Sequence, residues 1–259
     1  MLVYGLNKSY ADIFCFSTTR HGGYSSGQYS SFNCNHYCGD SPDDVERNRV
    51  LLTEIMPCRP QALVIPHQIH SAEVRMIDAG FLVADESERK ELLEGVDAVM
   101  TNIPRVCVCV STADCIPVLL YDVRNKAVAA IHAGWRGTVA RIVEKTLKQM
   151  QTACGTLIQD VVAVIGPGIS LQSFEVGDEV YQTFKEAGFD MDIIARRYSK
   201  WHIDLWEANR LQLVSAGVNP DNIEVSGICT YTECEDFFSA RRLGINSGRI
   251  ISGIMLKGG

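Results

Sequence analysis

Two stretches decide how the fold and the site are predicted. They are ADCIPVLLYD, Ala113–Asp122, and AAIHAGWRG, Ala129–Gly137. Each combines an apolar, strand-like run with small, polar or aromatic residues that packing alone does not require. Cys115 stands just before one run, and His132 stands at the end of the other. A thiol and an imidazole at neighbouring strand ends indicate a metal site, a Cys–His nucleophile pair, or a buried core without chemistry.

The two stretches are expected to pair with each other as a β-hairpin. The segment DVRNK, Asp122–Lys126, is typical of a turn, so Val118–Tyr121 and Ala127–His132 would lie antiparallel on either side of it. In that register Cys115 and His132 would come close together, because both stand about the same distance from the turn. Pro117 predicts a kink at the start of the first strand, since proline cannot donate to a strand ladder.

Short apolar runs and amphipathic segments predict the remaining elements. Strands are expected at 13–19, 62–65, 73–77, 97–101, 105–112, 161–165, 223–228 and 249–256, and helices at 42–55, 138–150, 174–184 and 204–216. A charged segment at 85–94 predicts a surface loop or short helix. No repeat, linker or low-complexity segment divides the chain. We therefore predict one α+β domain over residues 1–259, with mixed sheets flanked by helices as a layered sandwich.

The helix after Ser41 has the clearest start signal. Ser41 and Asp44 form a capping-box pattern, with proline and two acidic residues in the first turn. Arg47 and Arg49 cannot share one face of this helix, so one is solvated while the other could face an anion; helix geometry does not choose between them. The positions expected to face inward are Val45, Val50, Leu51, Leu52 and Ile55.

Composition narrows the classes of protein. The net charge of −7 argues against a general nucleic-acid binder, which needs a basic face. No run reaches the roughly 18 apolar residues of a membrane helix. Ten cysteines would suit a disulfide framework, but the start MLVYGLNKSYADIF carries charges where a signal peptide is apolar. We therefore expect free thiols in a reducing cytoplasm, and neither nucleic acid nor membrane as a partner.

Two chemistries can be written for the thiol–imidazole pair. A catalytic zinc takes three protein ligands, and Cys115, His132 and His70 would supply them. The spacings, 115 − 70 = 45 and 132 − 115 = 17, are those of a site assembled by the fold and carry little specificity. The rival is Cys115 as nucleophile with His132 as base and Asp114 or Gln68 as orienter. A copper oxidase is disfavoured because the sequence has no His-x-His pair.

Two glycine-containing turns are candidate anion sites. Residues 134–137 lead into a predicted helix beside Arg136, and such a helix entry can bind an anion. Arg20 precedes His21 and two glycines, whose backbone can approach a ligand closely. The alternatives are an ordinary strand-to-helix turn and an ordinary hairpin turn.

Several long motifs, in order, give the chain a resemblance to a known family. These are QIHSAEV (68–74), TADCIPVLLYD (112–122), AAIHAGWRG (129–137), VIGPGIS (164–170) followed by FEVGDEV (174–180), and CTYTECEDFFSARR (229–242). Together they resemble the YfiH/laccase-domain family, which has been called multicopper polyphenol oxidase, purine nucleoside phosphorylase with adenosine deaminase activity, and peptidoglycan editing factor. The match spans nearly the whole chain.

The resemblance implies a ligand set and a fold. It implies zinc bound by His70, Cys115 and His132, and a sandwich related to bacterial deamidating toxins that use a Cys–His pair. It also selects Arg49, in ERNR, as the counterpart of an arginine in the family's helix motif. The segment CNHYC, residues 34–38, departs from the family's simpler loop, and we assign Cys34, His36 and Cys38 no role.

The resemblance further implies zinc-dependent phosphorolysis of adenosine, inosine and methylthioadenosine, with deamination of adenosine. Phosphate and substrate would be bound by Arg49, Arg136, Arg20 and Gln68, and an acidic helper would be Asp114 or Glu175. Zinc could supply the activated water that deamination requires. The alternatives are a metal-free Cys–His hydrolase of cell-wall precursors, a copper-dependent polyphenol oxidase, and a partner-binding module without catalysis.

Overall fold

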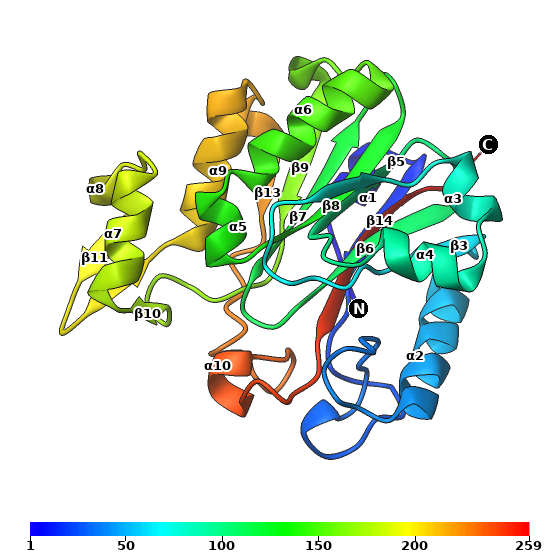
Figure 1. Ribbon diagram of the computed structural model, residues 1–259, viewed down its shortest axis with the longest axis horizontal. Coiled ribbons are helices and arrows are strands. Elements are labelled where there is room, and N and C mark those ends of the chain that lie inside the picture. The colour runs from blue at the N-terminus through cyan, green and yellow to red at the C-terminus, as the bar shows by residue number, and fades with distance from the viewer. Residues whose placement is uncertain (259) are drawn as a thin grey trace.

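Two β-sheets packed face to face form the centre of the molecule, and helices cover their outer faces (Figure 1). The computed structural model describes residues 1–258. The layers run helix, sheet, sheet, helix, so the predicted α+β class with mixed sheets flanked by helices is confirmed. In residues 1–258 no helix combines the length and the apolar character that crossing a membrane requires.

The six-stranded sheet contains the hairpin predicted from the sequence. Its strands, in spatial order, are β13 (Ile223–Val225), β9 (Val161–Ile165), β7 (Ile116–Asp122), β8 (Ala127–Ala133), β5 (Ala98–Thr101) and β4 (Val74–Met76). The outer pairs β13–β9 and β4–β5 are parallel, and the inner pairs are antiparallel. Ile116 pairs with Ala133 and Asp122 with Ala127, which confirms the predicted hairpin.

The second sheet has five strands, in the order β1 (Leu2–Val3), β2 (Ile13–Ser17), β14 (Ile250–Leu256), β6 (Val106–Thr112) and β3 (Ala62–Val64). Side-chain alternation along each strand separates the two faces of a sheet. In β7, Leu119 and Tyr121 pack between the sheets, whereas Val118 and Leu120 face the helices. Both faces of β7 are therefore buried, which explains its near-continuous apolar sequence.

Helices close the two outer faces. Over the six-stranded sheet lie α5 (Trp135–Val139), α6 (Ile142–Cys154) and α9 (Leu205–Ala216), while α2 (Pro42–Ile55) covers the five-stranded sheet. A side unit holds α7 (Asp178–Glu186), α8 (Met191–Ile194) and the sheet of β10 (Glu175–Val176), β12 (Trp201–Ile203) and β11 (Ala195–Arg197). The shorter helices are α1 (Leu6–Ser9), α3 (Ala79–Val83), α4 (Glu86–Leu92) and α10 (Ala240–Leu243).

Helix α2 begins where the sequence predicts, but part of its inward face differs. The Ser41 hydroxyl accepts a hydrogen bond from the Asp44 backbone N–H, as a cap should. Val45 and Leu52 are buried as predicted, whereas Val50 and Ile55 are exposed. The buried face is Val45, Asn48 and Leu52, and the Asn48 amide donates to the loop after β2. Val50 is two residues from both Asn48 and Leu52, so helix geometry places it on the opposite side.

Three other local predictions are wrong in detail. β7 runs through Pro117 without ending, because the carbonyl that lacks the proline's N–H has another donor. The Pro117 carbonyl accepts from the Gly166 N–H, and the Gly166 carbonyl accepts from the indole N–H of Trp206. The predicted helix 138–150 is two helices, α5 and α6, separated at Arg141, which has a left-handed backbone. The predicted helix 174–184 starts only at Asp178, because residues 175–176 pair with β12.

Candidate metal centre

A cavity of about 540 Å³ opens at one end of the sandwich. Its wall is made by the loop after β2, the loop after β3, the ends of β6 and β8, the segment leading into β7, and the region of α10 and the start of β14. Segments that are far apart in sequence therefore meet at one hollow. Its volume is in the range of pockets that bind small organic ligands.

Three metal-ligating side chains, His70, Cys115 and His132, meet in this cavity. Their donor atoms all lie within 4.8 Å of one another, and Cys115 Sγ is 3.7 Å from His70 Nε2. The two imidazole rings meet edge to face with centroids 4.9 Å apart. His132 comes from β8, Cys115 stands just before β7, and His70 lies on the loop between β3 and β4. This cluster could hold a metal ion.

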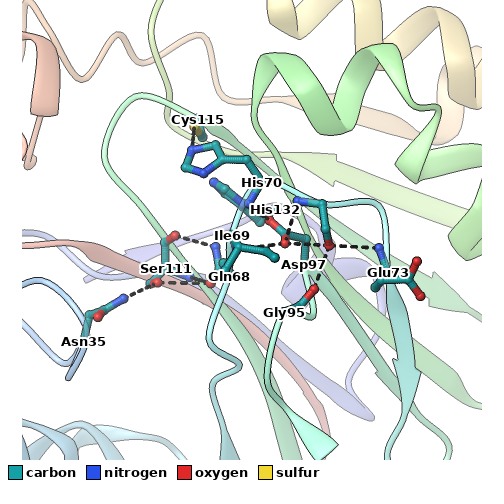
Figure 2. A network of polar contacts seen from close by, with 11 residues as sticks. Asn35, Gln68, Ile69, His70, Glu73, Gly95, Asp97, Ser111, Cys115 and His132 are labelled. Atoms are coloured by element: carbon teal, nitrogen blue, oxygen red, sulfur yellow. Dashed lines mark hydrogen bonds and ion pairs between the residues drawn. The ribbon is translucent and has the colours of Figure 1, made fainter.

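One buried carboxylate, that of Asp97, orders both histidines (Figure 2). Its Oδ1 is 2.6 Å from Nδ1 of His132, and it accepts hydrogen bonds from the backbone N–H groups of Ile69, His70 and Ser71 at 2.9–3.1 Å. These bonds wrap the loop around the carboxylate, and His70 takes a left-handed backbone with φ 65°. Because Nδ1 of His132 donates to Asp97, the neutral form of the ring would carry its lone pair on Nε2.

Gly134 leaves the space that the cluster occupies. A Cβ at this position would lie 2.8 Å from Cδ2 of His70 and 3.1 Å from Sγ of Cys115. Both distances are shorter than ordinary van der Waals contacts, so any larger residue would displace a ligand side chain. The glycine is therefore required by the close approach of the three donors and not by its own backbone conformation, which has an ordinary φ of −68°.

Replacing Gly134 with alanine is expected to lower metal affinity by at least about 10-fold while the protein still folds. The added methyl group would push the exposed His70 ring outwards, away from Cys115, without entering the core. Competition with a chromogenic chelator measures the affinity. Gly5→Ala is the control, since Gly5 is exposed, has helical φ and ψ and does not line the cavity. Wild-type affinity in folded Gly134→Ala protein would show that the space is not needed.

A family model described as multi-copper polyphenol oxidoreductase laccase matches residues 14–257. The chain belongs to this laccase-domain family. A protein of Bacteroides thetaiotaomicron named purine nucleoside phosphorylase is 54% identical over 259 residues, covering 99% of this chain and 96% of the relative. A protein named adenosine deaminase, from an unknown prokaryotic organism, is 43% identical over 253 residues and 96% of each chain. The predicted family and the prediction of an enzyme are thus confirmed.

Solved structures share the fold of this laccase-domain chain. The structure titled hypothetical protein YfiH from Bacillus licheniformis superposes with a TM-score of 0.89 at 29% identity, over 96% of this chain and 95% of that one. YlmD from Geobacillus stearothermophilus gives a TM-score of 0.88 at 30% identity, over 96% and 93% of the two chains. The four-layer sandwich is therefore the fold of these relatives as well.

Charges inside the laccase-domain cluster favour a thiolate. Burial raises the pKa of Cys115, but the adjacent His132 and His70 outweigh this effect and bring that pKa down to about 6. Burial lowers the pKa of His132, whereas Cys115 and Asp97 raise it to about 9. Without a metal the pair is a thiolate beside an imidazolium. A metal would use the thiolate directly and would displace the proton of His132.

Asp114 and Gln68, both predicted near the reaction, line the cavity but have their polar atoms occupied. One oxygen of Asp114 accepts from the Thr230 hydroxyl and the other from the Arg241 backbone N–H, each at 2.7 Å. The Gln68 side chain donates to the Ser111 carbonyl and accepts from the Ser111 backbone N–H, both at 2.8 Å. These contacts hold the walls of the cavity in place.

The three arginines predicted to bind phosphate do not line the cavity in residues 1–258. Arg20 donates to the carbonyls of Ser30 and Cys234, and Arg136 is exposed over the ring of Trp135. Arg49 donates to the carbonyl of Cys34, and burial lowers its pKa. Glu175, predicted as an acidic helper, pairs with Lys200 outside the cavity. Their functional roles stay predictions.

Residues that the sequence analysis did not select line the cavity too. Tyr37 and His67 stack with ring centroids 3.9 Å apart, and His67 Nδ1 lies 2.7 Å from a carboxylate oxygen of Glu94. Cys38, to which we assigned no role, contributes to the wall. The arginines in the wall are Arg241 and Arg249. Arg241 is the first arginine of the motif FFSARR and was available as a signal; the others are single residues in loops.

Proposed function

We propose that this chain is a zinc-dependent purine nucleoside phosphorylase that also deaminates adenosine. The observation that carries the proposal is the cluster of His70, Cys115 and His132 inside a cavity large enough for a nucleoside. The names of two relatives, a purine nucleoside phosphorylase and an adenosine deaminase, support both activities. Purine nucleosides and inorganic phosphate would be the partners.

The residues of the cluster fit zinc. Two imidazoles and one thiolate are zinc ligands, and three protein ligands leave the fourth tetrahedral position for a water or substrate. Gly134 leaves room for the donors to converge, and the Asp97–His132 contact is the carboxylate–histidine arrangement common behind metal ligands. When bound, zinc supplies Lewis acidity, which can activate a water or polarise a substrate atom.

The chain's own residues position that chemistry. Asp97 fixes the tautomer and the orientation of His132 and holds the loop that carries His70. Gln68 and Asp114 fix the backbone that leads into Cys115, because Gln68 binds Ser111 and the Asp114 carboxylate accepts from α10. A substrate in the cavity would therefore meet donor groups whose positions are set before it arrives, which lowers the entropic barrier to reaction.

A metal-free Cys–His hydrolase is a second candidate, and one observation favours it. The Cys115 thiolate, the His132 imidazolium and the Asp97 carboxylate form a chain of nucleophile, proton donor to the leaving group, and orienter. That arrangement needs no metal and would act on acyl groups such as those of cell-wall precursors. Asp97 takes the orienting place for which the sequence analysis considered Asp114 or Gln68.

A copper-dependent polyphenol oxidase is the third possibility, and the description of the family names a multi-copper polyphenol oxidoreductase. Among residues 1–258, His70, Cys115 and His132 form the single group of three such donors close enough to hold one metal ion. A multicopper oxidase needs further copper sites, so this candidate is weaker than the first two.

We propose that the protein acts in the cytoplasm. All ten cysteines are free in the structure, including pairs that are close in sequence such as Cys107 and Cys109. Free thiols of this number suit a reducing compartment.

The proposal is tested with protein loaded with one zinc ion per chain. Inosine with phosphate should give hypoxanthine and ribose 1-phosphate, and adenosine without phosphate should give inosine, each at a rate proportional to bound zinc. Chromatography of the bases and metal analysis are the measurements. Removal of the metal with a chelator should abolish both reactions, and zinc should restore them.

Other outcomes select the alternatives. Hydrolysis of a muropeptide precursor by metal-free protein, with no reaction of nucleosides, would establish the Cys–His hydrolase. Oxidation of a phenol only after loading with copper, again without reaction of nucleosides, would establish the oxidase.

A further inference from the structure

Two arginines from neighbouring segments line the cavity that holds the metal-ligating cluster. Arg241 lies in α10, and Arg249 stands directly before β14. The segment between them, 244–248, is short, and its Ile245 also lines the cavity. The proposed phosphorolysis requires a phosphate beside the nucleoside, and these two guanidinium groups are the cationic side chains of the cavity wall.

Neither arginine has an acidic partner in the part of the chain that the structure describes. The ion pairs within residues 1–258 include neither guanidinium. The one carboxylate in the wall, Asp114, is already engaged by Thr230 and by the Arg241 backbone. In a chain with a net charge of −7, the wall of this cavity holds two guanidinium groups against one carboxylate, that of Asp114. Such a hollow attracts an anion.

The two side chains are held in place but keep donors to spare. Arg249 donates from both terminal nitrogens to the carbonyls of its own loop, at Ile245, Ser247 and Gly248. Arg241 makes one such bond, of 3.1 Å, to the carbonyl of Glu175. A guanidinium has five N–H groups, so two on Arg249 and four on Arg241 stay available for oxygen atoms. Fixed, planar donors of this kind match the oxygens of phosphate.

The backbone ties both arginines to the reaction centre. The Arg241 backbone N–H donates to the carboxylate of Asp114, which precedes Cys115 in the chain. The Arg249 backbone N–H donates at 3.0 Å to Asn33 in the loop after β2, which also lines the cavity at Asn35. The positions of the guanidinium groups are thus coupled to the walls that hold the cluster.

We propose that Arg241 and Arg249 form the phosphate subsite of this enzyme. The ligand is a tetrahedral oxyanion, hydrogen phosphate, and the proposal rests on the proposed function. One phosphate oxygen forms a bond to C1′ of the ribose while the C1′–N9 bond breaks and its electron pair leaves with the purine. The proton of hydrogen phosphate ends on the purine, so the products are the free base and ribose 1-phosphate. The subsite binds and orients the attacking oxyanion.

The test compares neighbouring arginines. In Arg241→Gln and Arg249→Gln the KM for phosphate in inosine phosphorolysis should rise at least 10-fold, while deamination of adenosine without phosphate stays within threefold of wild type. Arg242→Gln is the matched control, since Arg242 lies on the same helix over the ring of Tyr231 and outside the cavity wall. Its KM for phosphate should not change. Arg241→Lys should recover part of the loss.

Calorimetric titration of inorganic phosphate into the zinc-loaded protein separates this proposal from the proposed function. If wild type binds phosphate, Arg242→Gln binds it equally, and Arg241→Gln and Arg249→Gln do not, the subsite stands even when no nucleoside reacts. Unchanged phosphate binding and KM in both cavity variants would overturn it, as would an equal loss in Arg242→Gln. Thermal unfolding identifies any variant that fails to fold. If Arg241→Gln does not fold, phosphate binding is measured in Arg241→Lys instead. Phosphate binding as tight as wild type in Arg241→Lys would overturn the role of Arg241.

Discussion

Protein in which serine replaces Cys115 should bind almost no zinc and should lose both phosphorolysis and deamination. The thiolate is the anionic ligand of the cluster, and a serine hydroxyl neither ionises at neutral pH nor binds zinc as well. Loss of a ligand should weaken binding by more than the roughly 10–100-fold that follows removal of a group hydrogen-bonded to a ligand. Metal analysis after gel filtration and the two activity assays measure the effect.

The control for this variant is Cys154→Ser, in the last turn of α6 and outside the cavity wall, which should keep its zinc and both activities. The fold of Cys115→Ser should survive, because Cys115 lies at the cavity wall and not in a hydrophobic core cluster. A variant that keeps a full complement of zinc yet loses activity would identify Cys115 as a nucleophile, in favour of the hydrolase.

Asparagine at position 97 should produce the second large effect, through the tautomer of His132. The carboxylate of Asp97 accepts the Nδ1 proton, whereas an asparagine amide can present an N–H to Nδ1 instead. The ring would then carry its proton on Nε2, the nitrogen that faces the cluster, and could no longer bind zinc. We expect zinc affinity to fall by about 10–100-fold. Because a buried charged contact is lost, the free energy of unfolding should also fall by roughly 3–5 kcal/mol.

Chelator competition and urea unfolding of the metal-free protein separate these two effects. Asp122→Asn is the matched control, because Asp122 is equally buried but lies at the opposite end of β7, where it accepts from the turn at Arg124 and Asn125. It should lower stability without changing zinc affinity. Wild-type zinc affinity in Asp97→Asn would show that Asp97 supports the fold but does not orient the ligand.

The sequence was sufficient for those features that depend on local pattern. The hairpin of β7 and β8 follows from two apolar runs around a turn, and the start of α2 follows from Ser41 and Asp44. The meeting of Cys115 with His132 followed from the same hairpin. The continuation of β7 through Pro117 could not be predicted, because it depends on the distant Trp206 indole donating to the Gly166 carbonyl that the proline cannot reach with an N–H.

The parts of the site that escaped prediction depend on tertiary structure. Asp97 lies 35 residues before His132 and 27 after His70, and only the left-handed turn at His70 brings that loop onto its carboxylate. Arg136 looked like an anion binder because a glycine-rich turn precedes it, yet α5 is a helix of five residues and the side chain is exposed. Long-range contacts, and not residue type, decide which arginines reach the cavity.

The Asp97 carboxylate also determines when the metal centre is assembled. Because a single buried group binds the loop of His70 and the ring of His132, two of the three ligands take their places as the chain folds. The conformational entropy of ordering that loop is then lost during folding and not during metal capture. The metal-free protein therefore already holds the His132 ring and the His70 backbone in the positions from which they could bind an ion.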